Sequence, residues 1–161
     1  MATNVSRKNK LAQKKPNVAT VRLILEPNLL RALEQAKESG SDEQVADLEP
    51  QVEEATVTLA FRSIGRHAVN ALIDANPPTE TDKADAERIK VDPDDLPWGQ
   101  SFEPALLAAS LLPEEGEEPL TAEDFAALYE SEDWTAAELR TLFSTALSVN
   151  NSNSIEALGK G

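Results

Sequence analysis

One segment in the middle of the chain changes its hydrophobic period from two to about 3.6 within a few residues, and no other feature limits the fold more. Its first half alternates apolar residues with small or polar ones, as a strand with one buried face does. Its second half spaces apolar residues as an amphipathic helix does, and Asn76-Pro77-Pro78 ends it because proline cannot continue a helix. The sequence therefore predicts a strand over about 55–61 that leads directly into a helix over about 64–75.

A second strand is predicted near the N-terminus, where residues 18–25 alternate in the same way. Glu26-Pro27 stops it, since proline offers no N–H to a sheet and suits the first turn of a helix. Two apolar stripes follow; Ser39-Gly40-Ser41 separates them and Pro50 interrupts the second. We expect a helical hairpin between two antiparallel strands. Two strands with one apolar face each are not stable alone, so helices must cover them.

Three short amphipathic helices are predicted in the last third of the chain. Ser101 and Thr121 are candidate N-caps of the first two helices. Thr135 and Glu138 form a capping box before the third, which has the strongest amphipathic pattern of the sequence. From Asn150 onward no apolar pattern remains, and the chain should fray.

These elements predict a mainly α (α+β) fold. A small two-stranded sheet with a helical hairpin between its strands belongs to a strand–hairpin–strand–helix unit over 17–76, and a compact bundle of short helices occupies 101–150. The other segments are polar: a basic tail over 1–16, an acidic Pro- and Asp-rich loop over 77–100 and a C-terminal tail over 151–161. We expect the two tails to be disordered and the loop to be either a linker or a functional loop.

Composition excludes several classes of protein. The chain has 161 residues, of which 40% are hydrophobic and only 4% aromatic, so its core must consist mostly of Leu, Ala and Val packed from helices. The absence of cysteine excludes disulfides and thiolate metal sites. No apolar run approaches the ~20 residues that span a bilayer, so we expect no membrane partner.

Charge is distributed unevenly along the chain. The sequence contains 29 acidic and 15 basic residues, a formal net charge of −14, yet residues 1–15 hold five basic residues and no acid. An acidic body repels the backbone of nucleic acids and favours solubility or a basic partner. Nucleic acid is therefore not an expected partner, and a contact of the basic N-terminal arm with DNA is the weaker alternative.

The search for catalytic and metal-binding residues is mostly negative. All six glycines are isolated, so no phosphate-binding loop is present. His67 is the only histidine and is expected on the surface of a helix. An acidic segment that begins at Asp92 partly matches the spacing of a calcium-binding loop, but Pro97 stands where that loop needs glycine. The sequence predicts no enzymatic activity, no cofactor and no metal site.

What remains is apolar surface on helices. Such stripes normally form core, but short helices joined by acidic loops can also leave a groove that accepts an amphipathic partner helix. Large side chains make the strongest anchors in interfaces. The candidate partner-binding residues are Trp98, Phe102, Leu107, Phe125, Trp134 and Phe143.

Five segments follow one another in a characteristic order: 20–27, 55–66, Asn76-Pro77-Pro78, 102–110 and 146–150. In this order they resemble the tail assembly chaperones of long-tailed, siphovirus-type bacteriophages that infect actinobacteria, and specifically the short product of the upstream reading frame. The family often has histidine before the two prolines, where this chain has asparagine.

The resemblance implies a non-catalytic protein of the host bacterial cytoplasm that binds the tape measure protein and promotes assembly of the tail tube. It also implies a longer product, made by a programmed −1 frameshift, that binds the tail tube protein. The codons available for Leu158-Gly159-Lys160 permit the slippery heptamer that such a frameshift needs. Self-association is left open. Two alternatives remain: a minor tail or adaptor protein retained in the virion, and an acidic mimic of nucleic acid that inhibits a host enzyme.

Overall fold

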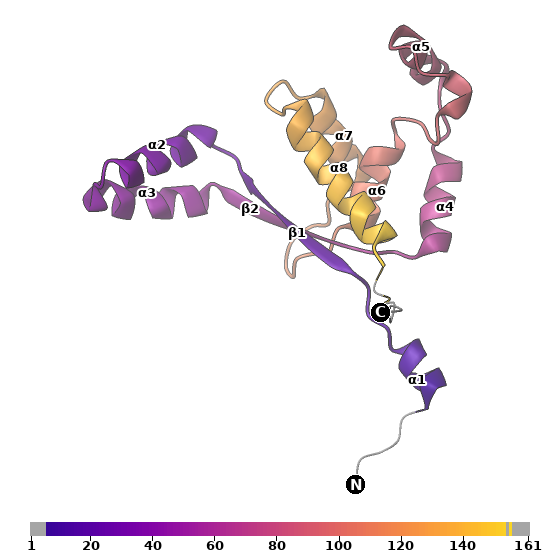
Figure 1. Cartoon of the computed structure of the whole chain (residues 1–161), viewed down its shortest axis with the longest axis horizontal. Helices are drawn as coiled ribbons and strands as arrows, with labels where there is room; N and C mark the ends of the chain where they lie inside the picture. The colour runs from indigo at the N-terminus through magenta and orange to yellow at the C-terminus, as the bar shows by residue number, and fades with distance from the viewer. Residues whose placement is uncertain (1–5, 154, 156–161) are drawn as a thin grey trace, which may run out of the picture. The chain divides into compact units, whose positions relative to one another are not determined.

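The computed structural model of this protein describes residues 6–153 and 155 (Figure 1). It is 58% helical and 10% strand, with one antiparallel two-stranded sheet, so the predicted mainly α (α+β) class is confirmed. The chain divides into two compact units: unit 1 comprises residues 1–19 and 61–161, and unit 2 comprises residues 20–60. Unit 2 is therefore an insertion between the two parts of unit 1.

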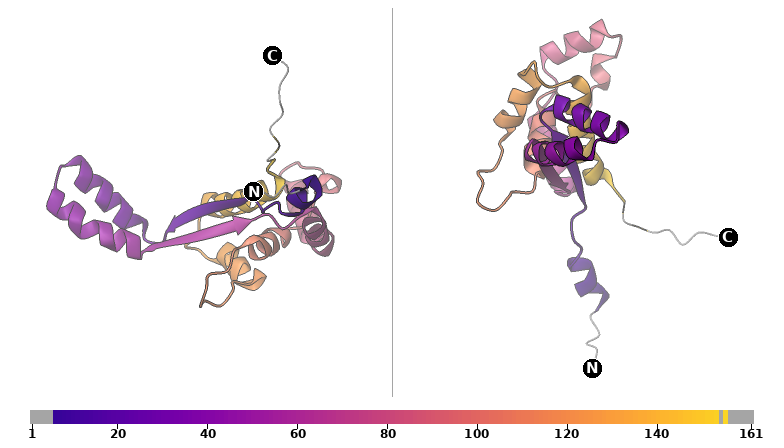
Figure 2. Two further views of the ribbon diagram at one scale, coloured as in Figure 1. Left: turned by 90° about the horizontal axis from the view of Figure 1, so that it is seen from below. Right: turned by 90° about the vertical axis from the view of Figure 1, so that its left-hand side faces the viewer.

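Unit 2 contains most of a β-ribbon and, as predicted, the helical hairpin between its strands; the first two residues of the first strand and the last two of the second strand belong to unit 1. Strand β1 (Val18–Ile24) is followed by helices α2 (Pro27–Glu38) and α3 (Asp42–Glu54) and by strand β2 (Thr56–Arg62). The two helices lie side by side (Figures 1 and 2). Gly40 joins them with a φ of 72°, a left-handed conformation that glycine adopts without strain.

The register of the ribbon is the same at both of its ends. The N–H of Leu25 donates to the carbonyl of Ala55 at 2.8 Å, and the N–H of Ser63 donates to the carbonyl of Asn17 at 2.9 Å. Both pairs belong to one antiparallel alignment, so no bulge shifts the strands between them. One face of the ribbon therefore carries the odd-numbered residues of both strands, and the other face carries the even-numbered ones.

The interruption predicted at Pro50 is wrong, because α3 continues through it. A proline inside a helix leaves the carbonyl four residues earlier without its partner. Here that carbonyl belongs to Ala46, and both residues are exposed, so water can satisfy it.

Unit 1 is helical and is organised around one central helix, α6, which packs against α4, α7 and α8. The large side chains that are fully buried come from all along this unit: Phe61, Phe102, Leu106, Leu107, Phe125 and Leu142. The helix after β2, which the sequence grouped with the strands, thus packs with the later helices. In chain order the elements are α1 (Arg7–Ala12), α4 (Arg66–Ala75), α5 (Glu80–Arg88), the 3₁₀ helix η1 (Pro93–Asp95), α6 (Phe102–Ser110), α7 (Ala122–Glu130) and α8 (Ala136–Asn151).

Two of the three predicted N-caps are confirmed. The hydroxyl of Thr121 accepts from the N–H of Asp124 at 3.2 Å, and the hydroxyl of Thr135 accepts from the N–H of Glu138 at 3.1 Å. Both acidic side chains bond back to the cap residue, which completes two capping boxes. The cap predicted at Ser101 is wrong: its backbone is already helical and its side chain makes no cap bond.

Two segments that were predicted to lack regular structure contain helices. The segment 77–100 contains α5 and η1, and α5 begins with a capping box between Thr79 and Asp82. The basic tail over 1–16 contains α1, whose N-cap is Ser6 and none of whose residues is buried. Because none of its residues is buried, α1 adds nothing to the core of unit 1. A helix this short also has little stability of its own in water.

Candidate interaction surface

Three of the six candidate partner-binding residues meet in one aromatic cluster of unit 1. The ring centres of Trp98 and Phe102 are 4.6 Å apart, and the ring of Phe143 lies 6.1 Å from each, edge-on to both. These tilted and edge-to-face arrangements are the favourable ones for aromatic rings. The cluster ties the segment before α6 to α6 itself and to α8.

Backbone contacts hold Trp98 in this cluster. The next residue, Gly99, is buried, and its N–H donates to the carbonyl of Asn76 at 2.7 Å. A Cβ atom on Gly99 would lie 2.3 Å from the carbonyl oxygen of Pro77, so only glycine allows the two segments to approach this closely. The carboxylate of Asp82 accepts a hydrogen bond from the N–H of Gln100 at 3.3 Å, which fixes this turn to the start of α5.

Burial separates the six candidates into two groups. Phe102, Leu107 and Phe125 are at most 1% exposed, so they form core, which is the other interpretation that the sequence left open for these stripes. The other three keep part of their side chains accessible, but Trp134 is not part of the aromatic cluster. The accessible candidates are Trp98, Trp134 and Phe143.

Two ionisable side chains of the helical bundle have perturbed environments that the sequence did not signal. The hydroxyl of Tyr129 is buried without a hydrogen-bond partner among the described residues. Burial, and then the negative charge of Glu103, raise the pKa of Tyr129, while burial raises the pKa of Glu103. His67 lies exposed on α4, as predicted.

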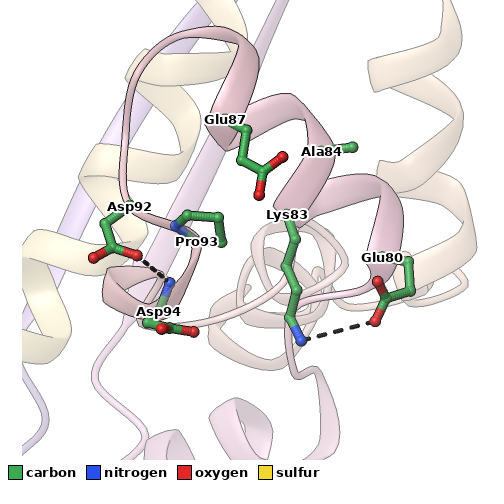
Figure 3. Close-up of a pocket in the computed structure, with 7 residues that line it drawn as sticks. All are labelled: Glu80, Lys83, Ala84, Glu87, Asp92, Pro93 and Asp94. Atoms are coloured by element: carbon green, nitrogen blue, oxygen red, sulfur yellow. Dashed lines mark hydrogen bonds and ion pairs between the residues drawn. The ribbon is translucent and has the colours of Figure 1, made fainter.

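A hollow of about 450 Å³ lies between α5 and η1 and is mainly acidic (Figure 3). Lys83 lies 3.8 Å from the carboxylate of Glu80, and the carboxylate of Asp92 accepts the N–H of Asp94 at 3.0 Å. In the part of the chain that the structure describes, no three His, Cys, Asp or Glu side chains are placed to hold a metal ion.

The surface that sequence reasoning missed is one face of the β-ribbon. The register sets Val21 opposite Leu59 and Leu23 opposite Val57, all on the same side, and Leu25 extends the row. We call these five residues the ribbon face. None of them is buried: Leu25 is 53% exposed, Val57 is 39% exposed, and the other three are half-buried. The prediction that helices must cover the apolar sides of both strands does not hold along this stretch.

Unit 2 buries few side chains and is strongly acidic. Its buried hydrophobic side chains are Leu33, Ala36 and Val52. A unit of about 40 residues usually needs further burial, a metal or a partner to be stable. Residues 20–60 carry nine acidic and three basic side chains. The ribbon face is therefore a partly exposed apolar surface on an acidic unit, which suits binding of another polypeptide.

No protein-family model matches the chain, and neither a curated protein nor a solved structure is significantly similar to it. Among the described helices, none is both long enough and apolar enough to cross a membrane.

Proposed function

We propose that this chain is a non-catalytic tail assembly chaperone of a long-tailed phage and that it binds the tape measure protein. The ribbon face is the observation that supports this proposal. A long helical tape measure protein exposes apolar stripes that would aggregate if left uncovered. An apolar face that its own unit leaves partly exposed can cover such a stripe, as grooves that accept amphipathic helices do.

The charge of the chain supports the same function. Unit 2 has three times as many acidic as basic side chains, and the whole chain carries a net charge of −14. Such a charge keeps a complex dispersed while its apolar surfaces are covered, and it favours a partner helix with basic flanks. The five segments that resemble the family support the proposal independently of the ribbon face. The frameshift, and with it a contact with the tail tube protein, concerns residues 158–160, which lie outside the described residues.

Co-expression with the tape measure protein of the same phage tests the proposal. Wild-type chain should keep the tape measure protein soluble and co-purify with it. Leu23→Asp and Val57→Asp place a charge in the ribbon face and should abolish both effects, because a buried unpaired charge opposes binding. Thr58→Asp is the matched control: it lies on the opposite face of β2 and should bind as the wild type does. Circular dichroism of all three variants checks that they remain folded.

Two results would end the proposal. One is a wild-type chain that neither solubilises nor retains the tape measure protein. The other is retention by the two ribbon-face variants that equals retention by the control. Mass spectrometry of purified virions separates the chaperone, which should be absent, from a minor tail or adaptor protein, which would be present. A nucleic-acid mimic would instead inhibit a host nuclease or polymerase in a direct assay.

A further inference from the structure

Strand β1 has an open edge. The sheet contains two strands, so each has a neighbour on one side only. The pairing of Leu25 with Ala55 shows that the odd-numbered residues of β1 direct their backbone groups toward β2. The N–H and C=O groups of Thr20, Arg22 and Ile24 therefore point to the outer edge, where no backbone bond from any described residue reaches them.

This edge lacks the features that usually protect one. Edge strands are normally kept from pairing by proline, by several charges, by a bulge or by a covering segment. β1 is seven residues long, contains no proline, and has a single charge, on Arg22, which pairs with Glu53 at 3.1 Å. The outer side of β2, in contrast, is partly occupied, since Phe61 forms an antiparallel bridge with Leu111. The edge of β1 is therefore the more open of the two edges to another strand.

We propose that a second copy of this chain occupies the edge, with the two β1 strands antiparallel about a two-fold axis at Val21. Val21 is the midpoint of β1, so this alignment pairs the strand along its whole length. It sets Thr20 of each copy opposite Arg22 of the other. Arg22, the only charged residue of β1, thereby faces the neutral hydroxyl of Thr20 in the other copy. It does not face the Arg22 of that copy, and two like charges directly opposite each other would be unfavourable.

The charge and the apolar pattern of β1 favour a copy of itself as the occupant. The net charge of the chain opposes self-association in general, but the stretch 17–25 contains no acidic residue. Pairing about Val21 joins the ribbon faces of both copies into one continuous apolar surface. It also converts two marginal two-stranded ribbons into one four-stranded sheet, which exceeds the three strands that a sheet normally needs for independent stability. The dimer does not depend on the tape measure protein.

Cross-linking tests this geometry directly, because the chain contains no cysteine. Val21→Cys would meet its own copy at a non-hydrogen-bonded pair, where the Cα atoms are about 4.5 Å apart and a disulfide can form. Leu59→Cys is the matched control: it is the cross-strand neighbour of Val21, equally half-buried and on the same face, but the two β1 strands separate it from its copy. Mild oxidation should convert the first variant to a covalent dimer and leave the second monomeric on a non-reducing gel.

Charge substitutions test the register. In sedimentation experiments on the full chain, Thr20→Glu should tighten the dimer and Thr20→Lys should weaken it, each by about 2- to 30-fold, because symmetry creates two charge pairs. Thr58 faces Arg22 from within the same copy, so Thr58→Glu and Thr58→Lys are controls that should leave the dissociation constant unchanged. A wild-type chain that stays monomeric at every concentration would overturn the proposal, even if a foreign strand binds the edge. Equal cross-linking of the two cysteine variants, or shifts of the same sign for both Thr20 variants, would also overturn it.

Discussion

The side-chain oxygen of Asn150 accepts a hydrogen bond from the backbone N–H of Ile64, 86 residues earlier, at 2.9 Å. The amide nitrogen of the same side chain donates to the hydroxyl of Ser110 at 3.0 Å and to the carbonyl of Ala146 at 2.7 Å. Ser110 is fully buried. One amide thus joins α8, the end of α6 and the segment before α4. The fraying predicted from Asn150 onward is wrong at this residue, because these bonds hold it in place.

Replacing this amide should destabilise the protein. Asn150→Ala leaves the hydroxyl of Ser110 and the N–H of Ile64 without their partner, and we expect a loss of about 2 kcal/mol in the free energy of unfolding, measured with urea. The neighbouring substitution Asn151→Ala is the control, since Asn151 is exposed, and it should change little. An Asn150→Ala protein as stable as wild type would show that water replaces the amide without cost.

Gly99→Ala should be among the more harmful small substitutions in unit 1. The added methyl group would lie 2.3 Å from the carbonyl oxygen of Pro77 and 3.1 Å from a carboxylate oxygen of Asp82. Backbone on one side of the clash cannot move as a flexible side chain could, so we expect about 1–3 kcal/mol of destabilisation in thermal or urea unfolding. Gln100→Ala changes an exposed side chain next to it and should have no comparable effect. Retained stability in Gly99→Ala would mean that the loop before α6 shifts easily.

Lys90→Gly should stabilise the protein. Lys90 has a φ of 63°, which is unfavourable for a residue with a side chain, and it occupies the position after α5 that usually holds glycine. The N–H of Val91 donates to the carbonyl of Ala86 at 2.8 Å, which completes this helix end. We expect about 1 kcal/mol of added stability, or about 2–4 °C in the melting temperature. Lys90→Ala removes the same charge but keeps the unfavourable conformation, so a gain as large in that variant would contradict the explanation.

Asp82 should make the stability of unit 1 sensitive to acid. The hydrogen bond from the backbone N–H of Thr79 holds the pKa of Asp82 below its ordinary value of 3.8, against the opposing effect of burial; the N–H of Gln100 helps. A depressed pKa means that the folded state is favoured above pH 3.8, and that this contribution is lost as the pH falls through the lower, folded pKa. Asp82→Asn should therefore cost about 0.5–1 kcal/mol near neutral pH, and its difference from wild type should shrink in acid. A difference that does not change with pH would contradict this role.

Deleting residues 1–15 should leave the melting temperature unchanged, because no residue of α1 is buried. Asn17 sets the limit of the deletion. Its N–H donates to the hydroxyl of Ser63 at 2.9 Å, and its side chain donates to the hydroxyl of Ser152 at 2.7 Å. Removal of residues 1–17 should therefore lower the melting temperature, and the comparison of the two deletions measures what these bonds contribute. A large loss in the shorter deletion would assign a structural role to α1.

Hydrophobic period and standard capping residues predicted most of the fold. The ribbon, the hairpin and α8 follow from patterns that local chemistry imposes, such as the Thr135–Glu138 capping box. Helix α5 was missed because its sequence is polar on nearly every side, so no apolar stripe marks it as a helix. Asn150 was missed because a polar residue that joins distant segments leaves no periodic signal.

The candidate partner residues could be predicted only in part, for a related reason. The side chains that suit an interface are those that a core with few aromatic residues also needs, and Phe102, Leu107 and Phe125 serve the core. The ribbon face could not be recognised, since alternation predicts an apolar side of a strand but does not say whether anything covers it.

The insertion of unit 2 between paired strands has an evolutionary consequence. Unit 1 stops at Ala19 and resumes at Phe61, and the register sets these two residues opposite each other. Because the chain leaves and returns at adjacent points, a segment of a different length or composition could replace residues 20–60 without pulling the helical bundle apart. Recombination could thus exchange the inserted unit of one lineage for that of another in a single event, while the bundle that carries it keeps its sequence.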